Sequence, residues 1–477
     1  MRKLLLIFIS FILPVCAWAD VLSLDSCRML ALKNNKQIKM ADEAVTGAGY
    51  LRKSAHAAYL PGIDFTVGYA YNQHKIELLG EDAKLPTMSF NPATMQYEYN
   101  LVKGADGIPV KDPSTGSYIP SEIAVIPKDA MAYDVHNVFA GAFTLTQPIY
   151  MGGQIRALNE IARYGEDMAV SARNVAVQDL LYSVDEAYWL VISLNEKQKL
   201  AKSFEGLVDS LCNNVKAMQR HGMATRSDVL TVEVRLNEAK IAYTKVSNGL
   251  SLARMALEQL CGLSIGSGIV LADESGMEMP GMQVIPYYSL DEVFARRQDL
   301  EVLRKSISLL ESKEKLSLST MLPKVMAIGS YSFSNPNVIH GFEKRFGGGF
   351  SIGAAVTIPL WHWGGNYHQY TASKSATLAQ RFLLEDMEEK VELQVNQAKY
   401  KFQEAFKTLD MTRMNMEKAD ENLRSAQLGY KEGVLTLDDV TAAQTAWLQA
   451  HSEELDAEIA VKLCETYLSK VLGLMPY

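Results

Sequence analysis

Two periodicities alternate along the chain and predict two kinds of element. In residues 63–71 and 350–358, apolar side chains occupy every second position, with mostly small or polar ones between them, a pattern typical of β-strands. Residues 139–147 and 325–334 follow a looser form of this alternation. Each run has about the 9–11 residues of a tilted transmembrane strand. Because a half-buried strand of a soluble sheet would alternate equally well, both interpretations stay open at this point.

Much longer helical segments follow the strands. Between Gly365 and Gly433, apolar or small residues recur at alternating steps of four and three, the heptad pattern of packed helices. This seam consists of Val391, Val395, Ala398, Phe402, Ala405, Leu409, Met416, Ala419, Leu423, Ala426 and Tyr430, and Thr412 interrupts it. A shorter seam consists of Phe204, Val208, Leu211, Val215 and Met218. Each unbroken helix would run about 100 Å at about 1.5 Å per residue, which predicts a coiled-coil bundle rather than a compact globule.

The chain contains one module twice. Residues 147–153, Gln-Pro-Ile-Tyr-Met-Gly-Gly, are echoed by residues 358–365, and the Gly-x-x-Thr-x-x-Asp pattern at 222–228 returns at 433–439. The separations 359 − 148, 433 − 222 and 473 − 262 all equal 211 residues. Such self-similarity at a fixed spacing is the signature of an internal repeat.

The repeat predicts the domain organisation. The first module is residues 20–263, with a helix, a β-hairpin at 63–147 and a long helix pair at 153–262. Residues 264–288 join it to the second module, residues 289–477, with a helix, a hairpin at 324–358 and a long helix pair at 365–473. The first hairpin has a long polar loop at 72–136, and the second turns within 335–347. Because barrels of this kind keep short turns on the periplasmic side, we expect both loops on the exterior.

The N-terminus has the features of a secretory signal peptide, residues 1–19. A basic start precedes an apolar stretch over residues 4–15 and a small-x-small cleavage site at residues 17–19. The apolar stretch is about half of the ~20 residues that span a bilayer, so a transmembrane helix is disfavoured. Lipidation at Cys16 is a minor alternative.

Composition narrows the functional classes. Beyond residue 19 no run of 18 or more apolar residues occurs, so we expect a periplasmic, secreted or β-barrel protein. Removing Arg2 and Lys3 from the 47 basic residues leaves 45 against 55 acidic ones, a net charge of −10, which argues against nucleic acid as a partner. The four remaining cysteines are interpreted as small buried side chains whose pairing the sequence does not reveal: Cys27, Cys212, Cys261 and Cys464.

The predicted strands favour an oligomer. A four-stranded sheet in lipid would leave two edges whose unpaired backbone groups cost several kcal/mol each, so copies of the chain must supply the missing partners. Two copies would give eight strands, whose interior is filled by side chains. Three copies, with twelve strands, are the smallest number that leaves a water-filled passage.

The duplicated Pro-Ile-Tyr-x-Gly-Gly and Pro-Leu-Trp-His-Trp-Gly-Gly turns, the Gly-x-x-Thr-x-x-Asp turns and the tandem modules resemble the TolC-like outer-membrane efflux channel family over essentially the whole mature chain. The resemblance implies a mixed fold in a homotrimer: a long α-helical coiled-coil barrel plus a transmembrane β-barrel shared between protomers, with four strands per chain. It implies a passive duct in the outer membrane with a large periplasmic part. The implied partners are a periplasmic adaptor, an inner-membrane transporter of RND, ABC or MFS type, and outer-membrane lipid.

Three groups of residues are candidate functional sites. Aromatic residues beside the Gly-Gly turns predict a membrane-interface girdle: Tyr150, Trp361 and Trp363. The helix-to-helix turns resemble the family's adaptor-docking tips: Gly222, Met223, Ala224, Thr225, Gly433, Val434, Leu435 and Thr436. By motif position the periplasmic gate consists of Asp439 as a ring carboxylate, with Asp228 and Tyr430 in a network between helices.

Two departures from the family pattern predict a weaker gate. Ala442 stands where a second acidic residue is expected, and Leu435 stands where a basic tie is expected. The spacing of Thr225 to Asp228, like that of Thr436 to Asp439, also fits a capping box, which stabilises a helix start without any gating role. Gate and cap therefore remain alternatives for both carboxylates.

We find no motif that would carry catalysis, so we expect neither an enzyme nor a cofactor. Gly347-Gly348-Gly349 lacks a following Lys-Ser and is interpreted as a turn rather than a phosphate cradle. Met277, Met279 and Met282 offer soft ligands for Cu(I) or Ag(I), but chance clustering is the favoured interpretation and no metal site is expected. The alternative function is a periplasmic adaptor, which would need one helical hairpin rather than two and no membrane strands.

Overall fold

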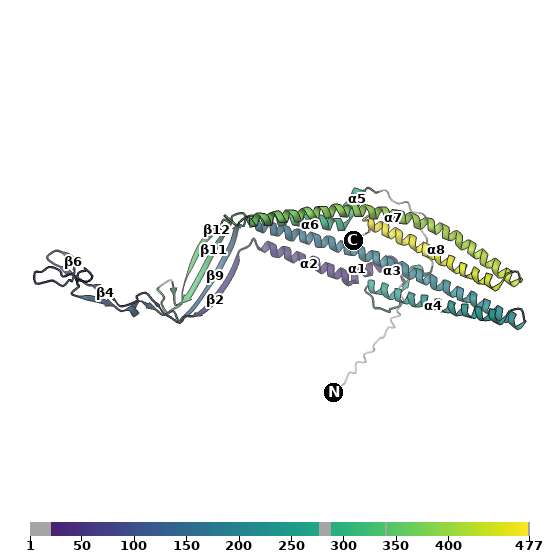
Figure 1. The fold of residues 1–477 in the computed structure, drawn as a ribbon, viewed down its shortest axis with the longest axis horizontal. Coiled ribbons are helices and arrows are strands. Elements are labelled where there is room, and N and C mark those ends of the chain that lie inside the picture. The colour runs from purple at the N-terminus through teal and green to yellow at the C-terminus, as the bar shows by residue number, and fades with distance from the viewer. Residues whose placement is uncertain (1–20, 276–287, 339–340, 476–477) are drawn as a thin grey trace, which may run out of the picture. The chain divides into compact units, whose positions relative to one another are not determined.

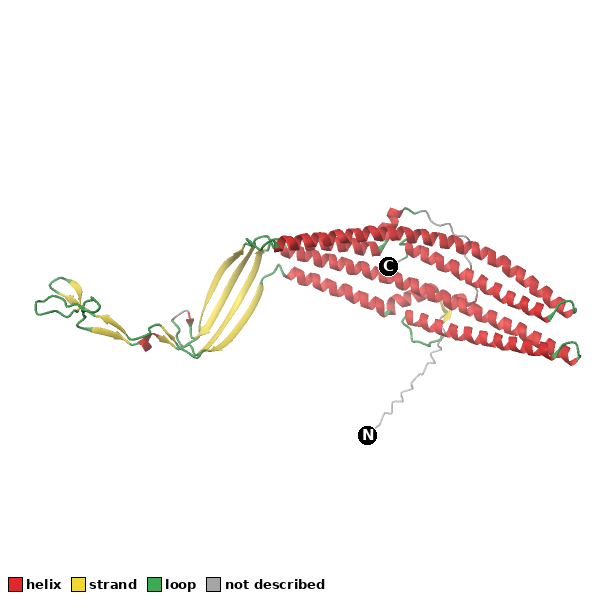
Figure 2. Cartoon of the chain, viewed as in Figure 1, coloured by secondary structure: helices red, strands yellow, loops and turns green. Residues whose placement is uncertain are grey.

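The computed structural model describes residues 21–275, 288–338 and 341–475. The predicted signal peptide, Cys16 and the three clustered methionines of the joining segment lie outside the described residues. The chain divides into a helical unit and a strand unit, the latter made of His56–Ile155 and Leu318–Asn366 (Figures 1 and 2).

The helical unit repeats one arrangement of helices. Its elements are α1 (Leu24–Asn34), α2 (Lys36–Ala57), α3 (Gln154–Arg220), α4 (Arg226–Leu260), α5 (Leu290–Arg296), α6 (Gln298–Ser319), α7 (Gly365–Lys431) and α8 (Leu437–Val471). Helices α3 and α7 are unbroken over 67 residues each, about 100 Å at about 1.5 Å per residue. The α3–α4 pair and the α7–α8 pair begin and end 211 residues apart.

Within the described residues, no helix combines the length and the apolar character needed to cross a membrane.

The heptad seam forms the packed side of α7. Its residues Val391, Val395, Ala398, Phe402, Ala405, Leu409, Leu423 and Ala426 are buried, and Met416 and Ala419 are half-buried. The interruption at Thr412 does not break the seam, because this side chain is also buried and its hydroxyl donates to the carbonyl oxygen of Leu409 at 3.0 Å. A hydrogen bond to the helix's own backbone satisfies the polar group at little cost.

Short strands and side chains join the N-terminal segment, the segment after α4 and helix α3. Strand β1 (Val21–Leu22) pairs in parallel with β10 (Val270–Leu271), which is followed by the 3-10 turn η2 (Ala272–Ser275). Tyr188 on α3 donates to the Asp273 carboxylate at 2.6 Å. Arg28 on α1 makes a bidentate ion pair with the fully buried Asp185 on α3, at 2.7 and 2.6 Å.

The strand unit is built around one antiparallel sheet. Its order is β12 (Gly347–Thr357), β11 (Lys324–Asn335), β9 (Asn137–Tyr150) and β2 (Gly62–Tyr71). The β9 strand runs three residues beyond the expected end of the hairpin and reaches Tyr150. Its pairing with β11 shifts next to Pro148, which has no N–H to give to the ladder.

The segment at 72–136, expected to be a loop, contains further paired strands. They are β3 (Ile76–Glu77), β4 (Ala83–Pro86), β5 (Met88–Asn91), β6 (Gln96–Tyr99), β7 (Ile123–Ile126) and β8 (Ala132–Tyr133), with the 3-10 turn η1 (Lys128–Met131) before β8. Strand β3 pairs with β8, β4 with β7, and β5 with β6. The pairing satisfies backbone N–H and C=O groups that a structureless loop would leave to water.

The expected turn at Gly347–Gly349 is wrong, because these glycines begin β12. A Cβ on Gly347 would lie 1.8 Å from Nδ2 of Asn337, and one on Gly348 would lie 2.8 Å from the Tyr331 hydroxyl oxygen. The glycines therefore allow neighbouring side chains to lie against the strand backbone.

Candidate functional site

The sheet has two chemically different faces, defined by the register of its four strands. One face carries large apolar side chains: Ile63, Phe65, Val67, Tyr69, Tyr71, Phe139, Phe143, Leu145, Tyr331, Phe333, Phe350, Ile352 and Val356. The opposite face carries mostly small or polar ones: Asp64, Thr66, Gly68, Ala70, Ala140, Ala142, Thr144, Thr146, Ser330, Ser332, Ser334, Ser351 and Gly353. Larger apolar residues on this second face are Val138, Met326 and Ile328.

The apolar face is largely uncovered by the described residues. Phe350 and Ile352 are 80% and 82% exposed. Aromatic rings pack along the face, with the centroids of Phe65 and Phe143 4.5 Å apart. Phe333 lies over Gly141, where a Cβ would come within 2.6 Å of the ring. A continuous apolar surface of this kind indicates contact with lipid or with another protein.

The polar face has few charges. Asp64 on β2 and Lys324 on β11 are the charged residues on it among the four described strands. The small and polar residues of the first strand were part of the predicted alternation, but they were not predicted to form a functional surface. The signal was available, since side chains of one strand alternate strictly between the two faces.

Both edges of the sheet lack a partner within the described chain. Strands β2 and β12 each pair on one side only. In an apolar surrounding, the unpaired backbone groups of an edge cost several kcal/mol each. The arrangement is therefore suited to completion by strands of other chains.

The two helix-to-helix turns have the same backbone geometry. Gly222 and Gly433 have φ of +77° and +76°, a region that glycine enters without strain. Met223 N–H donates to the carbonyl of Met218, and Val434 N–H donates to the carbonyl of Gly429, which closes each long helix with a Schellman motif.

Side chains at these turns project into solvent. Met223 is 66% and Val434 79% exposed, whereas Ala224 packs against the apolar cluster below the turn. The expected docking residues thus include a large apolar side chain in each turn.

A capping box follows each turn. Thr225 N–H donates to the Asp228 carboxylate at 2.8 Å, and Thr436 N–H donates to the Asp439 carboxylate at 2.9 Å. The threonine hydroxyls accept from the aspartate N–H groups at 3.2 and 3.3 Å. The hydrogen bond from the Thr225 N–H lowers the pKa of the Asp228 carboxyl, and those from the Thr436 hydroxyl, at 2.7 Å, and the Thr436 N–H lower that of Asp439. The capping interpretation therefore holds for both carboxylates.

Tyr430 is half-buried on α7 and packs against an apolar cluster shared by the ends of both helix pairs. The members of this cluster are Val208, Leu211, Cys212, Val215, Val229, Val232, Leu423, Ala426, Val440 and Ala443. Burial, and secondarily the negative charge of Asp228, raises the pKa of Tyr430. The structure therefore places Asp228 and Tyr430 near each other, whereas Asp439 is exposed.

Leu435 closes the second turn. Its N–H donates to the carbonyl oxygen of Gly429 at 3.1 Å. A Cβ on Gly429 would lie 2.8 Å from Cδ1 of Leu435. Gly429 is thus a tip residue that the sequence analysis missed.

The three aromatic residues lie where the strands meet the long helices. Tyr150 ends β9, and Trp361 and Trp363 lie between β12 and α7. Trp361 and Trp363 are 72% and 87% exposed, with ring centroids 5.9 Å apart in an edge-to-face arrangement. Their exposure fits an interfacial role.

Similar solved structures share this fold. A structure of CusC has a TM-score of 0.72 at 14% identity, over 94% of this chain and 92% of that one. The outer membrane protein VceC from Vibrio cholerae has a TM-score of 0.70 at 14% identity, over 94% and 96%. The open state of the MtrE outer membrane channel from Neisseria gonorrhoeae has a TM-score of 0.70 at 17% identity, over 94% and 88%.

Comparison with curated protein sequences finds no match. The family model described as outer membrane efflux protein matches residues 128–263 and 289–474, which is more than half of the chain. It includes both helix-to-helix turns, strand β9, the second hairpin and both aromatic junctions. The chain therefore belongs to the outer membrane efflux protein family.

Proposed function

We propose that this protein is the outer-membrane channel of a tripartite efflux or type I secretion system. Three copies would join their four-stranded sheets into a twelve-stranded barrel, and the long helices would continue the passage through the periplasm. The two-faced sheet with two unpaired edges is the observation that carries the proposal.

The chemistry of the two faces supports an outward and an inward side. An apolar aromatic face suits lipid, and a lumen in water suits small and polar side chains. Twelve strands enclose a wider interior than eight, whose centre is filled by side chains. The protein would then act as a passive duct, neither catalysing a reaction nor holding a cofactor, and the energy for export would come from its partners.

We assign the partners by family. A periplasmic adaptor would engage the exposed Met223 and Val434 at the two turns, and an inner-membrane transporter of RND, ABC or MFS type would choose the cargo. Asp439 would form a ring around the closed tip, with Asp228 and Tyr430 linking helices nearby. Tyr150, Trp361 and Trp363 would anchor the barrel at the membrane interface.

Neighbouring residues of β2 test the face assignment. In the otherwise unchanged protein, Thr66→Cys and Val67→Cys would each be exposed to a negatively charged, membrane-impermeant methanethiosulfonate reagent during planar-bilayer recording. The reagent should reduce the conductance of trimers carrying Thr66→Cys, because residue 66 faces the lumen, and should leave Val67→Cys and the wild type unchanged. Equal effects at both positions, or a protein that forms no trimer, would contradict the proposal.

A further inference from the structure

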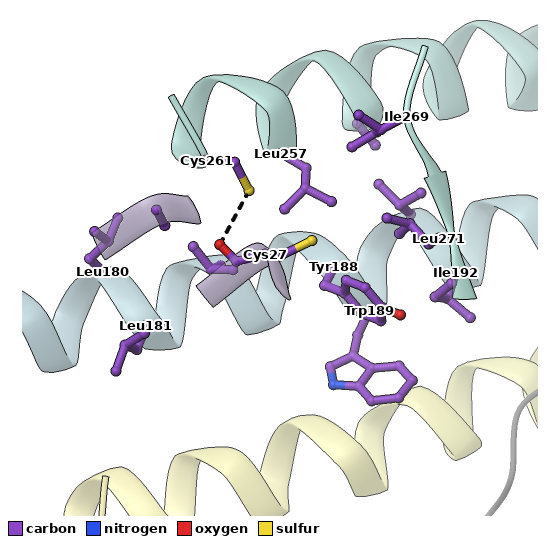
Figure 3. Close-up of a cluster of buried hydrophobic side chains, with 14 of the residues drawn as sticks. Cys27, Leu180, Leu181, Tyr188, Trp189, Ile192, Leu257, Cys261, Ile269 and Leu271 are labelled. Atoms are coloured by element: carbon purple, nitrogen blue, oxygen red, sulfur yellow. Dashed lines mark hydrogen bonds between the residues drawn. The ribbon is translucent and has the colours of Figure 1, made fainter. Parts of the chain in front are cut away.

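Two cysteines that are 234 positions apart in the chain meet in one apolar cluster. Cys27 lies on α1 and Cys261 is the C-cap of α4, and both are 0% exposed. The Cys261 thiol lies 3.6 Å from the carbonyl oxygen of Cys27 and donates a hydrogen bond to it (Figure 3). Leu257 and Tyr188 lie beside the pair, and Ile192 belongs to the same cluster.

The end of α4 interlocks with the junction of α1 and α2, seven to eight residues along the chain from Cys27. Gly262 has φ of +68°, and a Cβ there would lie 2.5 Å from that of Asn34. The side-chain amide of Asn35 donates to the carbonyl oxygen of Leu260 at 2.9 Å. A disulfide requires Cα atoms within about 7 Å of each other. The contact of the Cys261 thiol with the Cys27 carbonyl oxygen brings the two residues together at this point of the fold, and a bond requires their side chains to rotate until the sulfur atoms meet.

The second module shows that packing alone does not call for cysteine here. Arg297 donates to the carbonyl oxygen of Val471 at 3.3 Å, and a Cβ on Gly473 would lie 3.0 Å from that of Arg296, so the interlock is repeated. At the position equivalent to Cys261, 211 residues on, stands Leu472, which is 2% exposed. An aliphatic side chain therefore fills this site well.

The other two cysteines of the described chain lie elsewhere. Cys212 belongs to the cluster below the helix tips, and Cys464 packs against two clusters on the α7–α8 side. None of these three clusters contains a second described cysteine.

We propose that Cys27 and Cys261 form a disulfide in the exported protein. The proposal rests on the location of the family in the cell envelope, where disulfides persist, and not on conduction. A periplasmic thiol–disulfide oxidoreductase would form a mixed disulfide with one cysteine. The thiolate of the other cysteine then attacks the sulfur atom of the first cysteine. The Cys27–Cys261 bond forms, and the oxidoreductase, which began with a disulfide, leaves with both of its cysteines reduced.

The step must come before the cluster closes. Both thiols are fully buried in the folded unit, so an enzyme reaches them only while α1 is undocked. The bond would then tie the N-terminal helix to the end of α4.

Thiol counting in the wild-type protein tests this inference directly. Mature protein extracted from outer membranes would be denatured in N-ethylmaleimide without reductant and weighed by intact mass spectrometry. We expect two adducts, at Cys212 and Cys464, and four after prior reduction. Peptide mapping without reduction should recover the Cys27 peptide linked to the Cys261 peptide. Four adducts without reduction, or a different linked pair, would overturn the proposal.

Single substitutions provide matched controls. Cys212→Ser should give one adduct before reduction and three after it. Cys27→Ser should give three adducts in both conditions, because Cys261 loses its partner. The wild-type measurement needs no variant, so a variant that misfolds does not weaken the test. Bilayer conductance recorded on the same wild-type preparation, before denaturation, separates the outcome for the disulfide from the outcome for the channel proposal.

Discussion

Glu258 near the end of α4 should hold the following loop closed. Its carboxylate is 1% exposed and accepts from Gly266 N–H at 2.5 Å, Ser267 hydroxyl at 2.9 Å and Gly268 N–H at 2.8 Å, with a longer contact from Ile269 N–H at 3.4 Å. Hydrogen bonds to a charged group contribute about 1.5–3 kcal/mol each. A buried carboxylate here replaces the water that these donors would otherwise need.

The perturbation is Glu258→Gln. The amide oxygen can keep the position that faces Ser267 and Gly268. The amide nitrogen then faces the N–H of Gly266, and because both groups are donors they form no hydrogen bond. One charge-assisted bond is lost, a buried donor is left unpaired and the remaining bonds become neutral, which together cost about 3 kcal/mol. Since 1.36 kcal/mol is a factor of ten, local opening of the loop should become roughly 100-fold more frequent.

Hydrogen exchange measured by mass spectrometry on residues 264–271 is the assay. We expect exchange of this peptide to accelerate roughly 100-fold at pH 7, with no change in peptides of α7. Glu238→Gln on the same helix is the control, because the Glu238 side chain is exposed and its carboxylate pairs with Arg235 on the helix surface rather than with the loop. Unchanged protection in the Glu258 variant would refute the reasoning.

The same carboxylate predicts a pH dependence. Burial alone would raise the pKa of Glu258, but hydrogen bonds from the loop outweigh it and the pKa lies below its ordinary value. A lowered pKa in the folded state stabilises the loop at pH values above the unfolded pKa of about 4.3, and this contribution is lost as the pH falls through the folded pKa. Wild-type protection, corrected for intrinsic exchange, should therefore fall in acid while that of Glu258→Gln stays nearly flat.

Three further predictions concern other parts of the chain. Asp439→Asn should reduce cation selectivity and block by multivalent cations in planar bilayers while the trimer stays folded, and unchanged block would leave Asp439 with the capping role alone. Gly429→Ala should displace the Leu435 side chain and weaken cross-linking to the adaptor, and normal cross-linking would separate the turn from docking. Arg28→Met should destabilise the fold by about 3 kcal/mol at pH 7 because Asp185 is left buried without its partner. Burial raises the pKa of Asp185, so the carboxyl is more readily protonated at pH 5 and its unpaired charge is then removed. The loss of stability relative to the wild type should therefore be smaller at pH 5, and thermal unfolding that gives an equal loss at pH 5 and pH 7 would contradict this.

The sequence alone determined the elements and their repetition. An alternation of two is typical of a strand with distinct faces and a seam of threes and fours of a helix, so β2, β12 and α7 were predictable as elements, although β12 begins three residues before the expected alternation. The turn at 433–439 was predictable for the same reason, because its glycine and its capping box act on their own backbone. The predicted module boundaries, the gate and the docking roles stay predictions.

Only the tertiary structure decided which distant residues meet. Residues 72–136 lack a clean alternation of apolar and polar side chains, so their strand pairing was not predicted. Thr412 interrupts the seam without disturbing the helix, because its hydroxyl donates to a backbone carbonyl. The loop that encloses Glu258 and the meeting of Cys27 with Cys261 could not be read from spacing. Periodicity depends only on the geometry of one segment, which fixes the face on which each side chain lies. Contacts between distant segments depend on how the helices and strands pack against each other.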